Sequence, residues 1–275
     1  MAVIYGTQGR DTLPGTDQDD VIRGWAVDGD QFFDLGDELR GVAGNDGLFG
    51  GGDDDFLDGG IGRDTLEGRN GGDTLVGGAG NDSIESGNGF DEINGGADDD
   101  SMEGGDGGNE IDGGIGRDTL DGGAGGDTLE GGANNDFLSG GAGRDVLDGE
   151  AGSDDLAGGA DNDTLFGETG NDRLSGGADN DRLEGWAGDD RLSGGGGRDS
   201  FEFRRDDDTD TILDFKDDAD TIALGARLGV TSKADALSRA TVVDGDTVFT
   251  FNTGDVLIVE NIADPELLRD DIIIL

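Results

Sequence analysis

A nine-residue period runs through the middle of this chain and constrains its fold more than any other feature. From residue 37 to residue 199, every ninth residue is an aspartate two positions ahead of an apolar residue, and Asn109 is the one exception. The apolar position never fails between Leu39 and Phe201. Nine residues are too few for a helix pair or a propeller blade, but enough for one tight turn and one short strand. Since such a repeat cannot bury its single apolar side chain alone, the repeats must stack on one another.

The residues inside the repeat indicate how the chain turns. We number each repeat so that the aspartate is position six and the apolar residue is position eight. Eighteen repeats have their position six between Asp46 and Asp199. Position one is Gly in all of these but one, and Ser86 is the exception. Position four is Gly, Asp or Asn, the residues that tolerate positive φ. We therefore expect positions one to six to form a turn with a left-handed residue at position four, and positions seven to nine to form a strand.

Two such repeats make one coil of eighteen residues. The sequence therefore predicts an all-β chain, folded as a parallel β-roll, which is a right-handed β-solenoid with two nonapeptides per coil. Its two parallel sheets should face each other through their Leu rows.

Three zones follow from the phase of the repeat. Residues 1–40 are predicted to form irregular N-terminal coils, because Asp20 and Asp37 are seventeen residues apart, one short of two repeats. An Asp20/Asp37 pair is therefore not expected, and Trp25, Phe32 and Phe33 are predicted to plug this edge. Residues 41–201 are the regular array.

Residues 202–275 contain less Gly and more β-branched residues. We expect strands at 211–215, 220–224, 247–251 and 256–259, and a short helix within 231–240. This zone is predicted to be a small, mostly β cap, because the last coil of a solenoid otherwise exposes unpaired backbone.

The composition excludes several classes of function. The chain has no Cys and no His, so thiolate or imidazole zinc sites and Ser-His-Asp or Cys-His catalysis are absent. It contains no P-loop, no G-x-S-x-G elbow and no EF-hand loop. With no catalytic constellation left, we predict that it is not an enzyme. A net charge of −48 makes nucleic acid and anionic membranes poor partners, whereas divalent cations are good ones.

The aspartates fall into two columns whose members are eighteen residues apart. The Asp37 column runs through Asp37, Asp55, Asp73, Asp91, Asn109, Asp127, Asp145, Asp163, Asp181 and Asp199. The Asp46 column runs through Asp46, Asp64, Asp82, Asp100, Asp118, Asp136, Asp154, Asp172 and Asp190. Stacked carboxylates repel one another in a partly dry turn, and a hard cation between successive turns resolves this. Calcium fits, because it takes six or more oxygen ligands in flexible geometry.

All nineteen residues are therefore candidate Ca²⁺ ligands. Nine adjacent pairs in one column and eight in the other give up to about seventeen sites. Asn109 supplies a neutral oxygen, so its two sites should be weaker. One buried apolar side chain per nine residues is a thin core against the entropy of ordering the chain, so we expect the metal-free array to be unfolded.

The segments GGIGRDTLE at 59–67, GGAGNDSIE at 77–85 and GGIGRDTLD at 113–121 resemble the RTX nonapeptide, G-G-x-G-x-D-x-U-x. The resemblance covers about 60% of the chain and implies the calcium-bound parallel β-roll. The tail resembles the uncleaved C-terminal signal of RTX proteins exported by type I secretion, because Asp270-Asp-Ile-Ile-Ile-Leu275 places acids before apolar residues. Trp186 replaces Gly at position two and is expected to be an exposed turn residue.

These features favour a secreted, extracellular or cell-surface structural protein that binds calcium. The N-terminus lacks a basic stretch followed by an apolar core, and no run of about eighteen apolar residues occurs, so we expect neither a cleavable signal nor a membrane span. The partners implied are calcium ions, the type I secretion machinery and further copies bound end to end, as in a surface layer, matrix or filament. The alternative is a non-catalytic RTX module of a secreted protease, lipase or alginate epimerase, or an adhesin.

Overall fold

The computed structural model describes residues 2–6, 11–24 and 36–275 of the chain, which divides into two compact units at residues 1–141 and 142–275. The strands form parallel β-solenoids, so the predicted all-β β-roll is confirmed. The predicted aromatic plug of Trp25, Phe32 and Phe33 lies outside the described residues. None of the helices among the described residues is long and apolar enough to cross a membrane.

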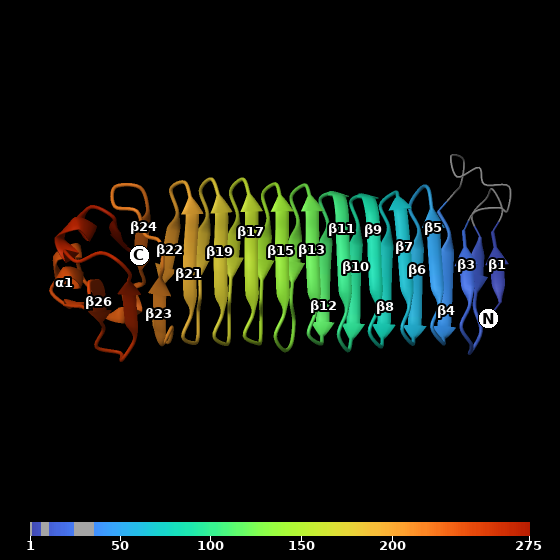
Figure 1. The fold of residues 1–275 in the computed structure, drawn as a ribbon, viewed down its shortest axis with the longest axis horizontal. Helices are drawn as coiled ribbons and strands as arrows, with labels where there is room; N and C mark the ends of the chain where they lie inside the picture. The colour runs from blue at the N-terminus through green and yellow to red at the C-terminus, as the bar shows by residue number, and fades with distance from the viewer. Residues whose placement is uncertain (1, 7–10, 25–35) are drawn as a thin grey trace. The chain divides into compact units, whose positions relative to one another are not determined.

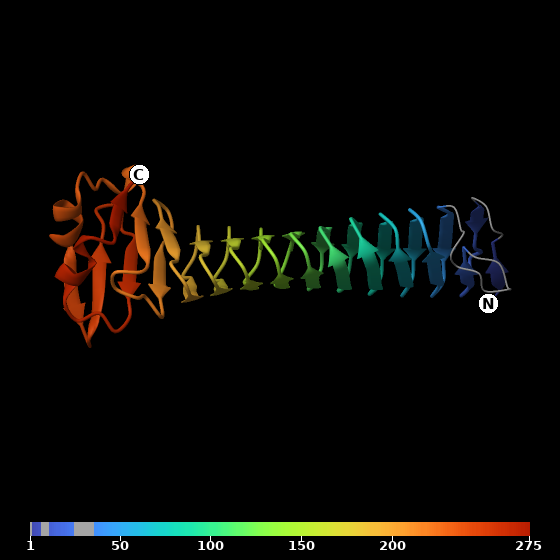
Figure 2. The same ribbon diagram turned by 90° about the horizontal axis from the view of Figure 1, so that it is seen from above.

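In residues 1–141, odd-numbered and even-numbered strands separate into two sheets (Figure 1). A second view shows the two layers (Figure 2). The first sheet has the order β1 (Val3–Tyr5), β3 (Val21–Arg23), β5 (Gly47–Gly51), β7 (Thr65–Asn70), β9 (Ser83–Gly89), β11 (Ser101–Gly107), β13 (Thr119–Ala124) and β15 (Phe137–Ala142). The second has the order β2 (Thr12–Pro14), β4 (Glu38–Ala43), β6 (Phe56–Ile61), β8 (Thr74–Ala79), β10 (Glu92–Ala97), β12 (Glu110–Ile115) and β14 (Thr128–Glu130).

In residues 142–275, two sheets again carry alternate strands, and each gains strands that are not repeats. One has the order β17 (Asp155–Ala160), β19 (Arg173–Ala178), β21 (Arg191–Gly196), β23 (Thr209–Ile212), β27 (Val256–Val259), β26 (Asp246–Thr250) and β25 (Ala240–Val243). The other has the order β16 (Val146–Asp148), β18 (Thr164–Phe166), β20 (Arg182–Glu184), β22 (Ser200–Phe203), β24 (Thr221–Leu224) and β28 (Ile272–Ile274). The helices are η2 (Ala226–Leu228), α1 (Lys233–Leu237) and η3 (Pro265–Arg269).

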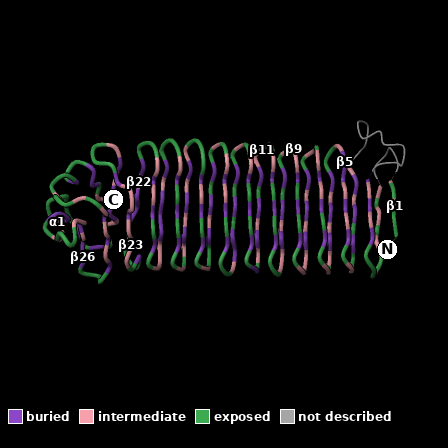
Figure 3. The backbone as a smooth tube through the Cα atoms, viewed as in Figure 1, coloured by how far each residue is buried: buried purple, intermediate pink, exposed green. Residues whose placement is uncertain are grey.

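The register confirms two repeats per coil. Ile93 on β10 pairs with Ile111 on β12, and Met102 on β11 pairs with Leu120 on β13, each across eighteen residues. Every apolar residue at position eight, from Leu39 to Phe201, is at most 2% exposed. Buried residues therefore run along the strands while exposed residues gather at the turns (Figure 3). The core is the two rows of these side chains.

The strands are longer than the sequence predicts. Most regular strands continue through positions one to three, as β10 does through Ala97, instead of ending at position nine. The reason is that these positions also pair with the next coil, as Gly96 does with Gly114. The turn therefore occupies positions four to six, and the predicted six-residue turn was wrong.

The backbone bends twice in each repeat. The left-handed residue predicted at position four is found in sixteen of the eighteen repeats, although not at Gly116 and Gly152. Position two has positive φ in all eighteen, including Arg69 (φ 88°) and Trp186 (φ 66°). This second bend lies inside the strand, and the residue types at position two did not lead us to predict it.

The C-terminal elements agree largely with prediction. Strands β23, β24, β26 and β27 correspond to the four predicted strands, and α1 lies within the predicted 231–240 helix. Strands β25 and β28 were missed. Strand β28 pairs in parallel with β24 and buries Ile272 completely, so part of the apolar C-terminal segment belongs to the sheet.

Candidate metal centre

The aspartate at position six is the residue at which each turn enters a strand. All nineteen predicted ligands are buried, and none is more than 4% exposed. Carboxylates are almost never buried to this extent without a partner. The bonds made by the two oxygens of each carboxylate therefore decide what the columns can do.

One oxygen of each carboxylate bonds the preceding coil. The backbone N–H of Asp46 donates to Oδ1 of Asp64 at 2.7 Å, and the N–H of Asp64 donates to Oδ1 of Asp82 at 2.7 Å. The Asp37 column repeats the pattern, since Asp55 N–H donates to Oδ1 of Asp73 at 2.8 Å. The structure therefore brings together residues eighteen apart, as the sequence predicts, and it holds each carboxylate in a fixed orientation.

The second oxygen is buried without a protein partner. Oδ2 atoms with no hydrogen-bond partner among the described residues belong to Asp46, Asp64, Asp73, Asp82, Asp91, Asp100, Asp118, Asp163, Asp172, Asp181, Asp190 and Asp199. An unsatisfied buried carboxylate oxygen carries a large desolvation cost, and native proteins compensate it with a donor or an ion. A repeated orphan of one kind therefore indicates a repeated ligand.

The glycine at position one shows what faces this oxygen. A methyl carbon placed on Gly77 would lie 2.6 Å from Oδ2 of Asp82 and 2.6 Å from the carbonyl oxygen of Gly95 in the next coil. The same substitution at Gly59 would meet Oδ2 of Asp64 at 2.6 Å and the carbonyl oxygen of Gly77 at 2.7 Å. Two acceptors thus border one small space without a proton between them. A cation satisfies both, and only Gly leaves the space open.

Asn109 is the natural control for this interpretation. A methyl carbon on Gly104 would lie 2.6 Å from Nδ2 of Asn109 and 2.6 Å from the carbonyl oxygen of Gly122, so the amide nitrogen takes the place of Oδ2. That nitrogen donates to the Gly122 carbonyl at 3.3 Å. Where the side chain can donate, the protein therefore satisfies the carbonyl oxygen by itself. The bond from Asp91 N–H to Oδ1 of Asn109 is also long, at 3.2 Å.

Ser86, the exception at position one, acts in the same way. Its buried hydroxyl donates to the carbonyl oxygen of Gly104 in the next coil at 2.7 Å. Ser86 belongs to the repeat of Asp91, the neighbour of Asn109 in the Asp37 column. Two consecutive coils of this column therefore carry a protein donor to a carbonyl oxygen of the next coil, although Oδ2 of Asp91 itself has no partner among the described residues.

Burial changes the acidity of the remaining carboxylates. It raises the pKa of Asp73 to about 7, and the charges of Asp91 and Asp54 add to the effect. It likewise raises the pKa of Asp100 to about 7, with Asp82 and Asp118 contributing, and that of Asp82 to about 6. Desolvation and like charge both disfavour the ionised form, and a bound divalent cation would reverse both.

The columns also extend past the slip near the N-terminus. The N–H of Asp20 donates to Oδ1 of Asp46 at 2.7 Å, and the N–H of Asp11 donates to Oδ1 of Asp37 at 2.6 Å. Asp20 therefore stacks on Asp46 and not on Asp37. Asp11 and Asp20 each stand two residues before an apolar residue, as the repeat aspartates do, and this is the sequence signal for them. Their partners are twenty-six residues away, which is not a multiple of nine, so the pairing was not predicted.

Trp186 departs from its predicted environment. It is half-buried, and the guanidinium carbon of Arg204 lies 5.1 Å from the centre of its ring. The prediction that Trp186 is an exposed turn residue is therefore wrong. The residue has positive φ at position two, and its ring lies beside Arg204, which directly follows β22.

The donor set is built from carboxylate and carbonyl oxygens only, which fits calcium and excludes the nitrogen and sulfur ligands of structural zinc sites. A family model of the RTX calcium-binding nonapeptide repeat, in four copies, matches residues 3–28, 33–66, 67–102, 94–129, 103–138, 130–165 and 166–201. These matches cover well over half of the chain. A search of curated proteins returned no match.

Proposed function

The chain belongs to the family of RTX calcium-binding nonapeptide repeats, and on this premise we propose that it is an extracellular structural protein whose β-roll folds when calcium binds after export. The repeats give it a calcium-binding structural role in a β-solenoid. The proposal concerns where and when the ions bind. The ligands are the nineteen position-six residues together with the turn carbonyl oxygens that face them.

The observation that carries the proposal is the row of buried Oδ2 atoms without protein partners. Most of them border the same small space as a carbonyl oxygen of the next coil, as Asp82 does with Gly95, and this supports an array that is completed by cations. We therefore expect the chain to be unfolded in a compartment that is poor in calcium and folded in one that is rich in calcium. Export by type I secretion fits this order, because the chain would cross before it folds.

End-to-end assembly is the finer part of the proposal. Strand β1 is the last strand of its sheet among the described residues, and Val3 and Tyr5 on it are 51% and 41% exposed. In residues 142–275, strand β25 is an edge strand of its sheet, and Val242 and Val243 on it are 47% and 52% exposed. Open strand edges bind other strands, and a contact between unlike ends of two copies does not close on itself. Filaments, a matrix or a surface layer would result.

Calcium titration followed by circular dichroism and by sedimentation tests both parts separately. We expect β-structure to appear as calcium is added, and the sedimentation coefficient to rise further at higher calcium. Full β-structure in excess chelator would overturn the calcium-dependent fold. Monomers alone in saturating calcium would overturn the assembly and leave the fold standing.

A further inference from the structure

Both Asp columns continue one coil beyond residue 201, where the repeat match ends. The N–H of Asp190 donates to Oδ1 of Asp210 at 3.1 Å, and the N–H of Asp199 donates to Oδ1 of Asp220 at 3.0 Å. Parallel pairing of β21 with β23 and of β22 with β24 places these residues in line. The spacings are twenty and twenty-one residues, so the nine-residue period does not reveal them.

In the Asp37 column, Oδ2 of Asp199 is buried without a partner, but the residue that follows it, Asp220, has protein donors. Oδ2 of Asp220 accepts from the backbone N–H of Lys216 at 2.8 Å, so both oxygens of Asp220 have partners. The ammonium group of Lys216 contacts the carbonyl oxygen of Gly195 in the last repeat. Its charge also opposes the rise that burial causes in the pKa of Asp199. A lysine therefore supplies positive charge at this end.

The Asp46 column ends without such a group. Asp210 is completely buried, and its Oδ2 has no partner among the described residues. Oδ2 of Asp190 and Oδ2 of Asp255 are likewise buried without partners. Within the described part of the chain, no lysine or arginine forms an ion pair with any of these three aspartates.

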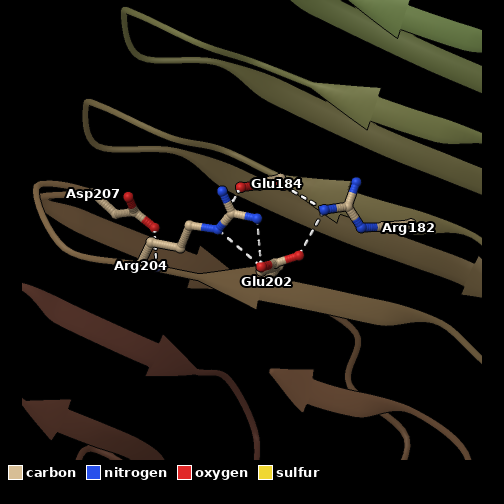
Figure 4. Close-up of polar contacts among 5 residues, drawn as sticks. All are labelled: Arg182, Glu184, Glu202, Arg204 and Asp207. Carbon is tan, nitrogen blue, oxygen red and sulfur yellow. Dashed lines mark hydrogen bonds and ion pairs between the residues drawn. The ribbon is translucent and has the colours of Figure 1, made fainter. Parts of the chain in front are cut away.

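The nearby arginines are already engaged (Figure 4). The guanidinium of Arg204 lies 2.9 Å from Glu184 and 2.6 Å from Glu202, and Arg182 contacts the same two glutamates at 2.7 and 2.6 Å. The backbone N–H of Arg204 donates to Asp207. These two cations balance the two glutamates and leave the aspartates without compensation.

The electrostatics show how crowded the acids are. Burial first, and then the charge of Asp190, raises the pKa of Asp210 strongly, and Asp207 adds to the effect. Burial raises the pKa of Asp207 to about 7, with contributions from Glu184, Asp255 and Asp190. Several buried carboxylates thus share one small region, where a divalent ion would compensate more than one of them.

We propose that Asp190 and Asp210 bind a calcium ion outside the nonapeptide repeats, whereas Asp220, whose two oxygens both accept bonds from backbone N–H groups, binds none. The proposal rests on the proposed function, because it takes the repeat columns to be calcium sites. It makes β23, the first strand after the repeats in its sheet, dependent on calcium. The C-terminal residues would then complete their fold only after the array has bound its ions.

Native mass spectrometry of the full chain in saturating calcium counts bound ions and tests the contrast directly. We expect Asp210→Asn to hold one ion fewer than the wild type, and the matched variant Asp220→Asn to hold the same number as the wild type. An unchanged count in Asp210→Asn overturns the new site. Loss of one ion in Asp220→Asn shows that Asp220 binds an ion and overturns the contrast.

A crystal structure of the wild-type chain grown in calcium tests the site without any substitution. An anomalous difference peak within about 2.3–2.6 Å of Oδ2 of Asp210 supports the site. Peaks along the repeats with none at Asp210 overturn it and leave the proposed function intact. A wild-type chain that binds no calcium at all overturns the proposed function instead.

Discussion

The two Asp columns have the same backbone, and both contain buried Oδ2 atoms without protein partners, but the Asp37 column also includes Ser86 at position one and Asn109 at position six. In residues 1–141, position one is Gly throughout the Asp46 column, and Oδ2 of Asp46, Asp64, Asp82, Asp100 and Asp118 has no protein partner. In the Asp37 column, a protein donor reaches a carbonyl oxygen at Ser86, at Asn109 and at Lys216. The comparison teaches that one turn geometry can place either an unpartnered carboxylate oxygen or a protein donor beside the carbonyl oxygen of the next coil. On the proposed function, side chains and not the backbone would set the demand for calcium at each coil.

Removal of calcium should have the largest effect, because it acts on both columns at once. We expect the chelated chain to lose its β-structure at neutral pH, since stacked carboxylates without cations repel one another and the apolar core is thin. Circular dichroism in excess chelator, followed by addition of calcium, measures the loss and its recovery. An equal β-signal in chelator and in calcium would show that neither column needs ions.

Acidification should partly replace calcium in the Asp46 column. The folded-state pKa values of about 6 for Asp82 and about 7 for Asp100 lie above the unfolded value of about 3.9. Protonation therefore favours the metal-free fold, whose stability is greatest below about pH 4 and is lost as the pH rises through about 7. In chelator we expect more β-structure at about pH 5 than at about pH 8.

Calcium binding should show the opposite dependence, because ions and protons compete for the same oxygens. The calcium concentration at half-folding is therefore expected to be higher at about pH 5 than at about pH 8. Titrations at the two pH values measure it, with the soluble fraction determined in each as the control. Metal-free β-structure that increases with pH would contradict the assignment of these acids.

Gly77→Ser should convert one step of the Asp46 column into the type seen at Ser86. The added Cβ would lie 2.6 Å from both Asp82 Oδ2 and the Gly95 carbonyl oxygen, so it takes the space of the ion. We expect one ion fewer by mass spectrometry and a loss of roughly 1–3 kcal/mol in stability with calcium. Gly72→Ser in the turn before β8, where a Cβ meets no atom closer than 3.2 Å, is the control. If both variants lose the same number of ions and the same stability, the space at Gly77 is not an ion site.

Asn109→Asp should have the smallest effect and the opposite sign. It replaces the amide that donates to Gly122 by a carboxylate oxygen and makes the Asp37 column resemble the Asp46 column at this step. We expect tighter calcium binding by up to about tenfold, or about 1.4 kcal/mol, and a metal-free form no more stable than the wild type. Isothermal calorimetry of both chains measures the change. Weaker binding would show that the carboxylate is not a ligand there.

The sequence alone predicts most of the fold, because its main signal is periodic. The distance between Leu39 and Leu57 defines one coil, and the structure pairs these residues directly. Asp46 and Asp64 stack for the same reason. Strict nine-residue phase leaves one way to bury every apolar residue, so local sequence and global fold agree.

What the sequence does not reveal depends on loops and backbone geometry. The spacings that join Asp11 to Asp37 and Asp190 to Asp210 are not multiples of nine, yet the members of each pair lie in the same column. The positive φ at Arg69 cannot be inferred from an arginine, because the neighbouring coils impose it. The donors of Ser86 and Asn109 become interpretable only when their carbonyl partners are known.

The eighteen-residue register also limits how such a chain can change its length. Removal of one coil, such as residues 59–76, would leave every remaining aspartate in its own column and every strand in its own sheet. Removal of nine residues would exchange the columns beyond the deletion, so that the donors of Asn109 and Lys216 would move to the other side of the roll. The N-terminal spacing keeps the two columns apart as well, because Asp11 bonds Asp37 and Asp20 bonds Asp46 across the same twenty-six residues. Insertions and deletions in this array should therefore survive in pairs of repeats and fail as single ones.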